Sequence, residues 1–277
     1  MNSKTGTLFV VATPIGNIAD ISPRAIESLA AASLILAEDT RHARKLLSHY
    51  GVETPVQACH EHNEQGLVPR IMARLEQGED IALVSDAGTP LISDPGYRMV
   101  QAARGLGIAV SPIPGASALV AALSVSGLPT DRFLFAGFLP PKSAKRLSRL
   151  EELRSLGCTV VLYESSHRIV DALTDIREVF GERAQICVGR EITKKFETFY
   201  TGTAAEVSET ISAVADNQKG EFVVVLGAVA SGGQDLQKAF DLARLLATEL
   251  PPKRAAKIAA EAFGVSRNDC YQAIIEK

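Results

Sequence analysis

Residues 83–96 read LVSDAGTPLISDPG, and this stretch decides the fold. The apolar run at 81–84 predicts a buried strand, and a helical pattern begins near Tyr97. About a dozen small, turn-forming and acidic residues lie between them, whereas a plain connection needs about two to six. Open α/β sheets bind ligands at the carboxyl ends of their strands. The stretch therefore predicts a ligand-binding loop, and an ordinary turn-rich connection is the alternative.

The same alternation of strand and helix runs along most of the chain. Apolar runs predict strands at 8–12, 34–37, 56–59, 81–84 and 108–110, with helical patterns between them. After a break at 127–130 the pattern restarts, with strands at 133–139, 159–163, 186–188 and 222–226 and helices at 144–155, 168–180 and 204–215. This order favours the α/β class with largely parallel sheets. We expect α/β domains at 1–126 and 127–230, followed by a helical extension at 235–277 with a helix-turn-helix pattern around Gly264.

Composition limits the possible functions. The chain has 277 residues, of which 46% are hydrophobic and 22% charged, as in ordinary globular proteins. Its formal net charge is −3, so a surface for nucleic acid must be a local patch. The four cysteines form no CxxC pair, and His60 and His62 have no further clustered ligand, so we expect no metal and a reducing compartment. No apolar run approaches the ~20 residues of a membrane helix and no signal peptide is present, which predicts a soluble, cytoplasmic protein without a membrane partner.

Two common nucleotide-binding motifs are missing from the sequence. No GxGxxG follows the first strand, and no GxxxxGK[ST] occurs. The segment TPIGN at 13–17 stands in the place of a phosphate loop with a single glycine, and Pro14 removes one backbone donor. We therefore expect any bound nucleotide to lack phosphates. A nucleoside-type cofactor fits apolar walls, backbone contacts to the base, and carboxylates for ribose hydroxyls or an amino group.

Four motifs occur in order at large spacings: TPIGN at 13–17, the loop at 85–96, PGASA at 114–118 and YESSHR at 163–168. Together they resemble the tetrapyrrole-methylase-like (class III) S-adenosylmethionine-dependent methyltransferases over about residues 6–230. Within that superfamily, AEDTR at 37–41 and ESSHR at 164–168 resemble the branch that methylates the ribose 2′-hydroxyl of a cytidine in 16S rRNA of the small ribosomal subunit. The tail also resembles the C-terminal extension of that branch.

The resemblance implies a fold, a cofactor and a set of contacts. It implies two α/β domains with a cofactor cleft between them, usually in a homodimer. The implied S-adenosylmethionine-binding residues are Pro14, Val84, Ser85, Asp86, Thr89, Ser117, Ala118, Glu164 and Ile192. Tetrapyrrole methylases usually carry Gly-Asp-Pro in the main loop, where this chain has Ser85-Asp86-Ala87. This departure favours an RNA substrate over a porphyrinoid.

Methyl transfer from a sulfonium is an in-line displacement, so the protein must hold the attacking oxygen roughly 3–3.5 Å from the methyl carbon. A nearby group that accepts the hydroxyl proton helps. The candidates at strand ends are Asp39, Glu164 and His167, with Glu38 beside them. Each has a structural alternative: Asp39 could cap a helix, and Glu164 could anchor Arg168 four residues later.

Binding of RNA requires local positive charge. Residues 142–149 carry four basic side chains, and a second group surrounds Phe196. The candidate RNA-binding residues are Arg41, Lys142, Lys145, Arg146, Arg149, Arg168, Lys194 and Lys195. The alternatives are a solvated helix face for 142–149 and structural ion pairs for Arg41 and Arg168.

The sequence supports three functions to different degrees. The first hypothesis is an RNA ribose 2′-O-methyltransferase, which uses both the ordered motifs and the basic segments. The second is a methyltransferase acting on a corrinoid or porphyrinoid, which needs neither the basic groups nor the helical tail. The third is a non-catalytic RNA-binding or ribosome-assembly factor on the same scaffold, which does not bind S-adenosylmethionine.

Overall fold

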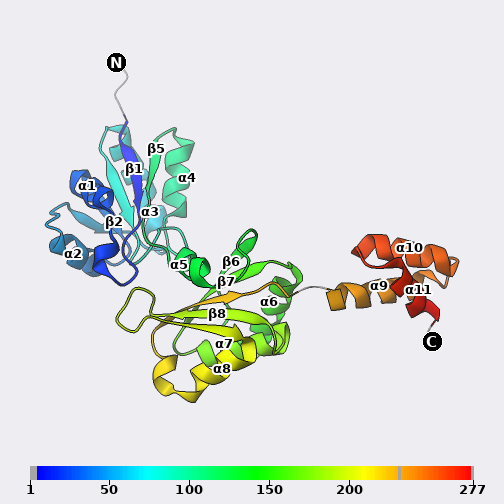
Figure 1. Cartoon of the computed structure of the whole chain (residues 1–277). Helices are drawn as coiled ribbons and strands as arrows, with labels where there is room; N and C mark the ends of the chain where they lie inside the picture. Colours follow the sequence, from blue (N-terminus) through cyan, green and yellow to red (C-terminus); the bar gives the residue numbers. More distant parts are fainter. Residues whose placement is uncertain (1–4, 230–231, 276–277) are drawn as a thin grey trace.

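The computed structural model describes residues 5–229 and 232–275, and for 232–236 it describes the backbone alone. The ends of the predicted domains at 1–4, 230 and 276–277 lie outside these residues. Figure 1 shows two sheets covered by helices, with a group of three further helices in orange and red. None of the helices in the described segments is long and apolar enough to cross a membrane.

The first sheet is entirely parallel, as predicted. Its order is β3-β2-β4-β1-β5, with bounds β1 (Thr7–Val11), β2 (Leu34–Ala37), β3 (Val56–Ala58), β4 (Ile81–Val84) and β5 (Ala109–Ile113). The helices around it are α1 (Pro23–Ala31), α2 (Thr40–His49), α3 (Glu64–Glu76) and α4 (Tyr97–Gly105). Separate apolar cores fill its two faces, one with residues of α1 and α2 and the other with residues of α3 and α4. Because the strands are parallel, the loops after β1, β2 and β4 meet at one edge.

Local chemistry explains several of these boundaries. All four residues of β4 are buried, as in a strand covered on both faces. At the start of α1, the Ser22 Oγ accepts a hydrogen bond from the Ala25 N–H at 3.1 Å, and Pro23 occupies the first turn. The predicted cap and proline therefore lie where the sequence placed them.

The second sheet is mostly antiparallel, so the prediction of largely parallel sheets is wrong here. Its order is β6-β7-β10-β8-β9, with bounds β6 (Phe133–Phe138), β7 (Thr159–Ser165), β8 (Gln185–Arg190), β9 (Thr198–Thr203) and β10 (Glu221–Leu226). Only β6 and β7 pair in parallel. The short segment 191–197 joins β8 to β9 without a helix, which permits only an antiparallel neighbour. No strand was expected at β9, whose residues are mostly half-buried.

Helices cover both faces of the second sheet. On one face lie α6 (Ser143–Ser155), α7 (Ile169–Phe180) and α8 (Ala204–Ala213), around the largest apolar core. On the other face, α5 (Ala118–Val125) packs Leu119 and Leu123 into a core with residues of β7, β8 and β10. The predicted division at 126/127 had assigned this helix to the first domain. From its packing we propose that the division lies between Ile113 and Ala118.

The chain ends in three helices: α9 (Gly232–Leu246), α10 (Pro252–Phe263) and α11 (Arg267–Ile275). They share a core of small side chains, which includes Ala243, Ala259 and Cys270. Gly264 closes α10 with a φ of 64°, the left-handed conformation typical of a helix C-terminus. The helix, turn and second helix predicted around this glycine are all present.

Candidate active site

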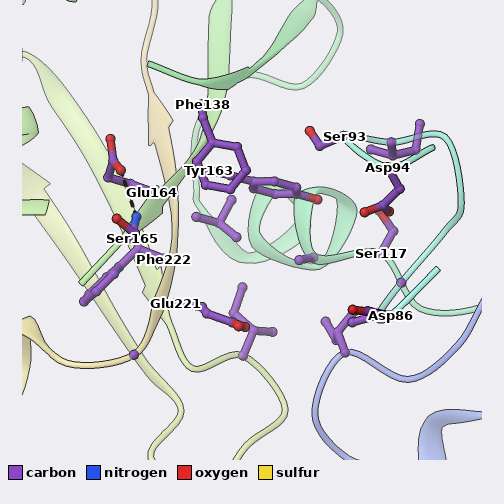
Figure 2. A pocket seen from close by; sticks show the side chains of 18 of the residues that line it. Asp86, Ser93, Asp94, Ser117, Phe138, Tyr163, Glu164, Ser165, Glu221 and Phe222 are labelled. Atoms are coloured by element: carbon purple, nitrogen blue, oxygen red, sulfur yellow. Dashed lines mark hydrogen bonds between the residues drawn. The ribbon is translucent and has the colours of Figure 1, made fainter. Parts of the chain in front are cut away.

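A cavity of about 470 Å³ lies between the loop that follows β4 and the second sheet. Its volume falls within the range of small-molecule sites. Figure 2 shows Asp86, Ser93 and Asp94 on one side, and Phe138, Tyr163 and Glu164 on the other. The first side comes from residues 85–96, named here the β4–α4 loop, and the second from strands β6, β7 and β10.

Hydrogen bonds tie the β4–α4 loop to three other motifs. The backbones of Thr13 and Gly88 exchange two bonds, of 2.9 and 3.0 Å. The Asp39 N–H donates to Asp86 Oδ1 at 2.9 Å. The Thr89 hydroxyl donates to the Ala116 carbonyl at 3.1 Å. Segments separated by tens of residues thus form one wall of the cavity.

The backbone of the β4–α4 loop is strained. Leu91 and Ser93 have φ values of 72° and 70°, in the left-handed region that non-glycine residues rarely occupy. Gly96 has a φ of 125°, and a Cβ there would lie 2.7 Å from Leu83 Cδ2. These turns fold the loop back so that Ser93 and Asp94 line the cavity (Figure 2).

Asp94 is a functional candidate that sequence reasoning missed. Burial raises the pKa of its carboxyl to about 6, and the negative charge of Glu38 contributes; a hydrogen bond with Ser85 opposes the rise, and Asp86 adds to it. Such perturbed carboxyls in a cavity are typical of functional sites. The available signal was a second aspartate in the quoted loop, but nothing local distinguished it from a turn residue.

Six of the nine residues expected to bind the cofactor line the cavity: Asp86, Thr89, Ser117, Ala118, Glu164 and Ile192. The other three do not belong to its lining. Val84 is buried in the core of the first sheet, and Ser85 is buried with its hydroxyl directed to the Ala87 carbonyl at 3.3 Å. Pro14 is half-buried, and its neighbour Ile15 lines the cavity instead. Val84 and Ser85 are therefore buried supports at the start of the β4–α4 loop and do not face the cavity.

Asp39 caps a helix, in agreement with the alternative reading. Its Oδ1 accepts the Arg41 N–H at 2.8 Å, and its Oδ2 pairs with Arg41 Nη2 at 2.7 Å. The hydrogen bonds from Arg41 hold the pKa of Asp39 well below its usual range. Asp39 does not line the cavity and is a weak base, so its catalytic role stays a prediction that its position does not favour.

Glu164 also matches its structural alternative. Only 3% of the residue is exposed, its Oε1 accepts the Ser165 N–H at 2.8 Å, and its Oε2 pairs with Arg168 at 3.0 Å. It lines the cavity as an anchored carboxylate, with both oxygens engaged. The third catalytic candidate, His167, is exposed and lies outside the cavity lining.

Arg146 is buried in an ion pair, which argues against its predicted role in RNA binding. The residue is 3% exposed, and its Nε lies 2.6 Å from Asp175 Oδ2. The Ser143 hydroxyl donates to the same oxygen at 3.1 Å. A buried ion pair of this kind joins α6 to α7 and keeps Arg146 away from solvent.

The other basic candidates differ in their pairing. Arg41 and Arg168 pair with Asp39 and Glu164, Arg149 pairs with Glu152 at 2.7 Å, and Lys194 pairs with Glu191 and Glu221 at 3.0 and 2.9 Å. Lys195 is exposed, with its Nζ 5.4 Å from the centre of the Phe196 ring. Lys142, Lys145 and Lys195 are exposed and form no ion pair with any described residue. These three lysines are the basic candidates with free head groups.

The two histidines that flank Glu61 lie near each other. The rings of His60 and His62 lie 6.0 Å apart, edge to face. Within segments 5–229 and 232–275, no group of three or more His, Cys, Asp or Glu side chains could hold a metal ion.

The whole chain matches known proteins. The family model of the tetrapyrrole (corrin/porphyrin) methylases matches residues 7–208, and the model of the RsmI C-terminal HTH domain matches residues 235–277. A ribosomal RNA small subunit methyltransferase I from Pseudomonas aeruginosa is 50% identical over 98% of both chains. This chain belongs to the ribosomal RNA small subunit methyltransferase I family. The relative of that name from Escherichia coli O157:H7 is 44% identical over 100% of this chain and 97% of its own.

Solved structures of tetrapyrrole methylases and their relatives share the fold of this family member. Diphthine synthase aligns with a TM-score of 0.62 at 16% identity, over 80% of this chain and 90% of its own. The methyltransferase CobJ aligns with a TM-score of 0.60 at 17% identity, over 82% and 95%. A uroporphyrin-III C-methyltransferase from Thermus thermophilus, complexed with S-adenosylhomocysteine, aligns with a TM-score of 0.55 at 17% identity, over 80% and 97%.

Proposed function

We propose that this protein is an S-adenosylmethionine-dependent methyltransferase of small-subunit ribosomal RNA, which methylates the ribose 2′-oxygen of a cytidine in 16S rRNA. The observation that carries the proposal is the cavity between two sheets, with Asp86 and Asp94 on one wall and aromatic rings together with the anchored Glu164 on the other, in a chain 50% identical to a protein of that name.

The cavity has the donor set that the cofactor requires. S-adenosylmethionine carries no phosphate and a positive sulfonium, and when bound it supplies the methyl group. The carboxylates of Asp86 and Asp94 match its positive charge, and the hydroxyls of Thr89 and Ser117 lie on the same wall. Apolar side chains, such as that of Ile192, form the facing surface. A Cβ on Gly88 would lie 3.3 Å from Ile15 Cγ2, so this glycine keeps the wall open to a ligand.

Asp94 is the best-placed acceptor for the hydroxyl proton. It lines the cavity, and its pKa of about 6 leaves it ionised at neutral pH while keeping it a useful base. Asp39 and Glu164 are both paired with arginines, and the hydrogen bonds from Arg41 lower the pKa of Asp39. In this scheme a carboxylate oxygen of Asp94 takes the proton of the ribose 2′-hydroxyl.

Positive charge for RNA lies on the second lobe, which is the domain that contains the second sheet. The first lobe is the domain that contains the first sheet. Lys142 and Lys145 follow β6, which borders the cavity, and Lys195 lies in the β8–β9 connection next to Ile192 and Lys194. Phosphate contacts from these lysines would hold the strand across the opening. The helix-turn-helix of α10 and α11 adds a second docking element for ribosomal RNA.

A homodimer completes the proposal. Val120 and Val125 on α5 are 57% and 55% exposed, and β6 is an edge strand of the second sheet. Exposed apolar side chains and an open strand edge are features that a second copy can cover. Sedimentation equilibrium should give twice the chain mass of 29.5 kDa, and a monomer at micromolar concentration would contradict this part.

The decisive experiment maps methylated riboses at nucleotide resolution. Small-subunit RNA from cells with and without the protein is compared, and naked 16S rRNA and assembled subunits are treated in vitro with labelled S-adenosylmethionine. One cytidine should gain a ribose methyl group only when the protein is present. Methylation of a base would contradict the 2′-oxygen, and no incorporation into any ribosomal substrate would remove the RNA function. In that case, tight tetrapyrrole binding would favour the small-molecule enzyme, and absence of cofactor binding by calorimetry would favour the non-catalytic factor.

A further inference from the structure

An exposed aromatic ring stands at the cavity, and the proposed chemistry does not use it. Phe138, the last residue of β6, is 57% exposed although it is large and apolar. It lines the cavity beside Tyr163, as Figure 2 shows. Its ring centroid lies 5.9 Å from that of Tyr163, at an interplanar angle of 67°. Such a ring is held in place on one side and open to solvent on the other.

A β-bulge directs this ring into the cavity. In a regular strand, residues 135 and 138 point to opposite faces because their separation is odd. In β6, however, Phe135 pairs with Val161 and Gly137 with Leu162, so one extra residue is inserted between them. Phe138 therefore lies opposite Tyr163 and on the same face as Phe135, whose ring contacts Tyr163 at 4.8 Å. Bulges next to active sites often re-aim a side chain in this way.

The bulge also contacts the wall that carries the carboxylates. Gly137 has a φ of 65°, which only glycine adopts at little cost. A Cβ at this position would lie 3.6 Å from Ser93 Oγ, so β6 and the β4–α4 loop meet here. The exposed ring thus stands next to the segment that presents Asp94 to the cavity.

A nucleotide must leave its stack to place its ribose inside such a cavity. Enzymes that act within nucleic acids extrude the target nucleotide and read it in a pocket. Proteins hold unstacked bases on aromatic rings, and each such stack contributes about 1–3 kcal/mol. Phe138 presents an open ring at the cavity, and the chain continues from it to the exposed Lys142 and Lys145.

We propose that Phe138 is the stacking platform for the extruded nucleobase of the target nucleotide, with the ring fixed by the bulge at Gly137 and by Tyr163. This inference rests on the proposed RNA-methylating function. It assigns Phe138 to substrate positioning, since the ring contacts the base and none of the reacting atoms.

The test compares three substitutions of one residue. Phe138→Ala removes the ring, Phe138→Leu keeps an apolar side chain without a ring, and Phe138→Trp restores an aromatic face. Steady-state methylation of small-subunit particles should show a KM for the RNA substrate raised about tenfold in the Ala and Leu variants and near wild type in the Trp variant. The dissociation constant for S-adenosylmethionine, measured by calorimetry, should change less than about twofold. Phe133→Ala, at the other end of β6 and 44% exposed, is the matched control.

Two outcomes would overturn the inference. An RNA KM that stays unchanged in the Ala and Leu variants, with intact melting temperatures, would show that no base stacks there. Weaker cofactor binding with an unchanged RNA KM would assign the ring to the adenine of the cofactor. Failure of the proposed function is distinct, because the wild-type protein itself would then place no methyl group on the RNA.

Discussion

The two walls of the cavity are built in different ways. The first wall consists of loops at the edge of a parallel sheet, joined by hydrogen bonds such as Asp39 N–H to Asp86 and Thr89 to Ala116. The second wall consists of side chains on the faces of β6, β7 and β10, which strand pairing and the bulge in β6 position. The loop wall holds titratable carboxylates, and the strand wall holds aromatic rings and an already neutralised ion pair, Glu164 with Arg168.

This difference indicates a division of tasks. Strained loops can bury several carboxylates close together, and burial first, then their mutual repulsion, raises the pKa of Glu38 and of Asp94. A sheet face offers a rigid apolar surface and, at its borders, exposed lysines. We therefore expect changes in the loop wall to affect cofactor binding and proton transfer, and changes in the second lobe to affect RNA binding or stability.

The largest effect is expected from Arg146→Ala, in the helix behind the second wall. The change leaves the Asp175 carboxylate buried without its partner, which should lower the free energy of unfolding by about 3–5 kcal/mol. Urea denaturation followed by circular dichroism measures this loss. The neighbouring Lys145→Ala should shift the stability by less than about 0.5 kcal/mol. If Arg146→Ala instead kept its stability and weakened RNA binding, Arg146 would be a phosphate ligand after all.

Asp94→Asn should give the next largest effect, about a 100-fold loss of kcat, since the amide cannot accept a proton. The wild-type protein needs the ionised carboxylate, so its kcat should fall about tenfold per pH unit below pH about 6 and level off above it. The variant should lose this acidic limb. Asp39→Asn is the matched control, because an asparagine can still cap α2. An Asp94→Asn enzyme with wild-type kcat and pH profile would rule out proton transfer to this residue.

Asp86→Ala should weaken S-adenosylmethionine binding more than tenfold in a calorimetric titration. The change removes a negative charge from the loop wall and also the acceptor for the Asp39 N–H. Asp86→Asn keeps an acceptor oxygen and removes only the charge, so comparing the two variants separates attraction from loop geometry. Unchanged affinity in both variants would show that the cofactor binds away from this loop.

The sequence predicted the loop wall better than the strand wall, for a physical reason. Turn and cap chemistry is local: Ser22 with Pro23, Gly264 and Asp86 carry their signal within a few residues. The parallel first sheet and the meeting of its loops followed from the strand pattern alone.

The features that the sequence did not predict depend on distant partners. In the sequence, Arg146 is indistinguishable from its exposed basic neighbours. Its burial depends on an ion pair with Asp175, which lies 29 residues away. The bulge at Gly137 depends on pairing with β7, and the attachment of α5 depends on the second sheet. Asp94 resembles any turn aspartate until Glu38 and Asp86 approach it through tertiary folding. The positions of these residues and elements are set by tertiary contacts, which a local sequence pattern does not predict.

The smallest effect is expected from the double substitution Lys142→Ala and Lys145→Ala. If both lysines contact phosphates, the slope of log affinity against log salt should become less steep by about 1.4–1.8, with the RNA KM raised a few-fold near 0.15 M salt. The cofactor dissociation constant and kcat should stay unchanged, since neither side chain lines the cavity. Arg70→Ala with Arg104→Ala, two exposed arginines on α3 and α4 of the first lobe, is the matched control of equal charge. An equal change of slope in the control would mean that RNA contacts both lobes alike. The loop wall would then still carry cofactor binding and proton transfer, but RNA binding would not be confined to the second lobe.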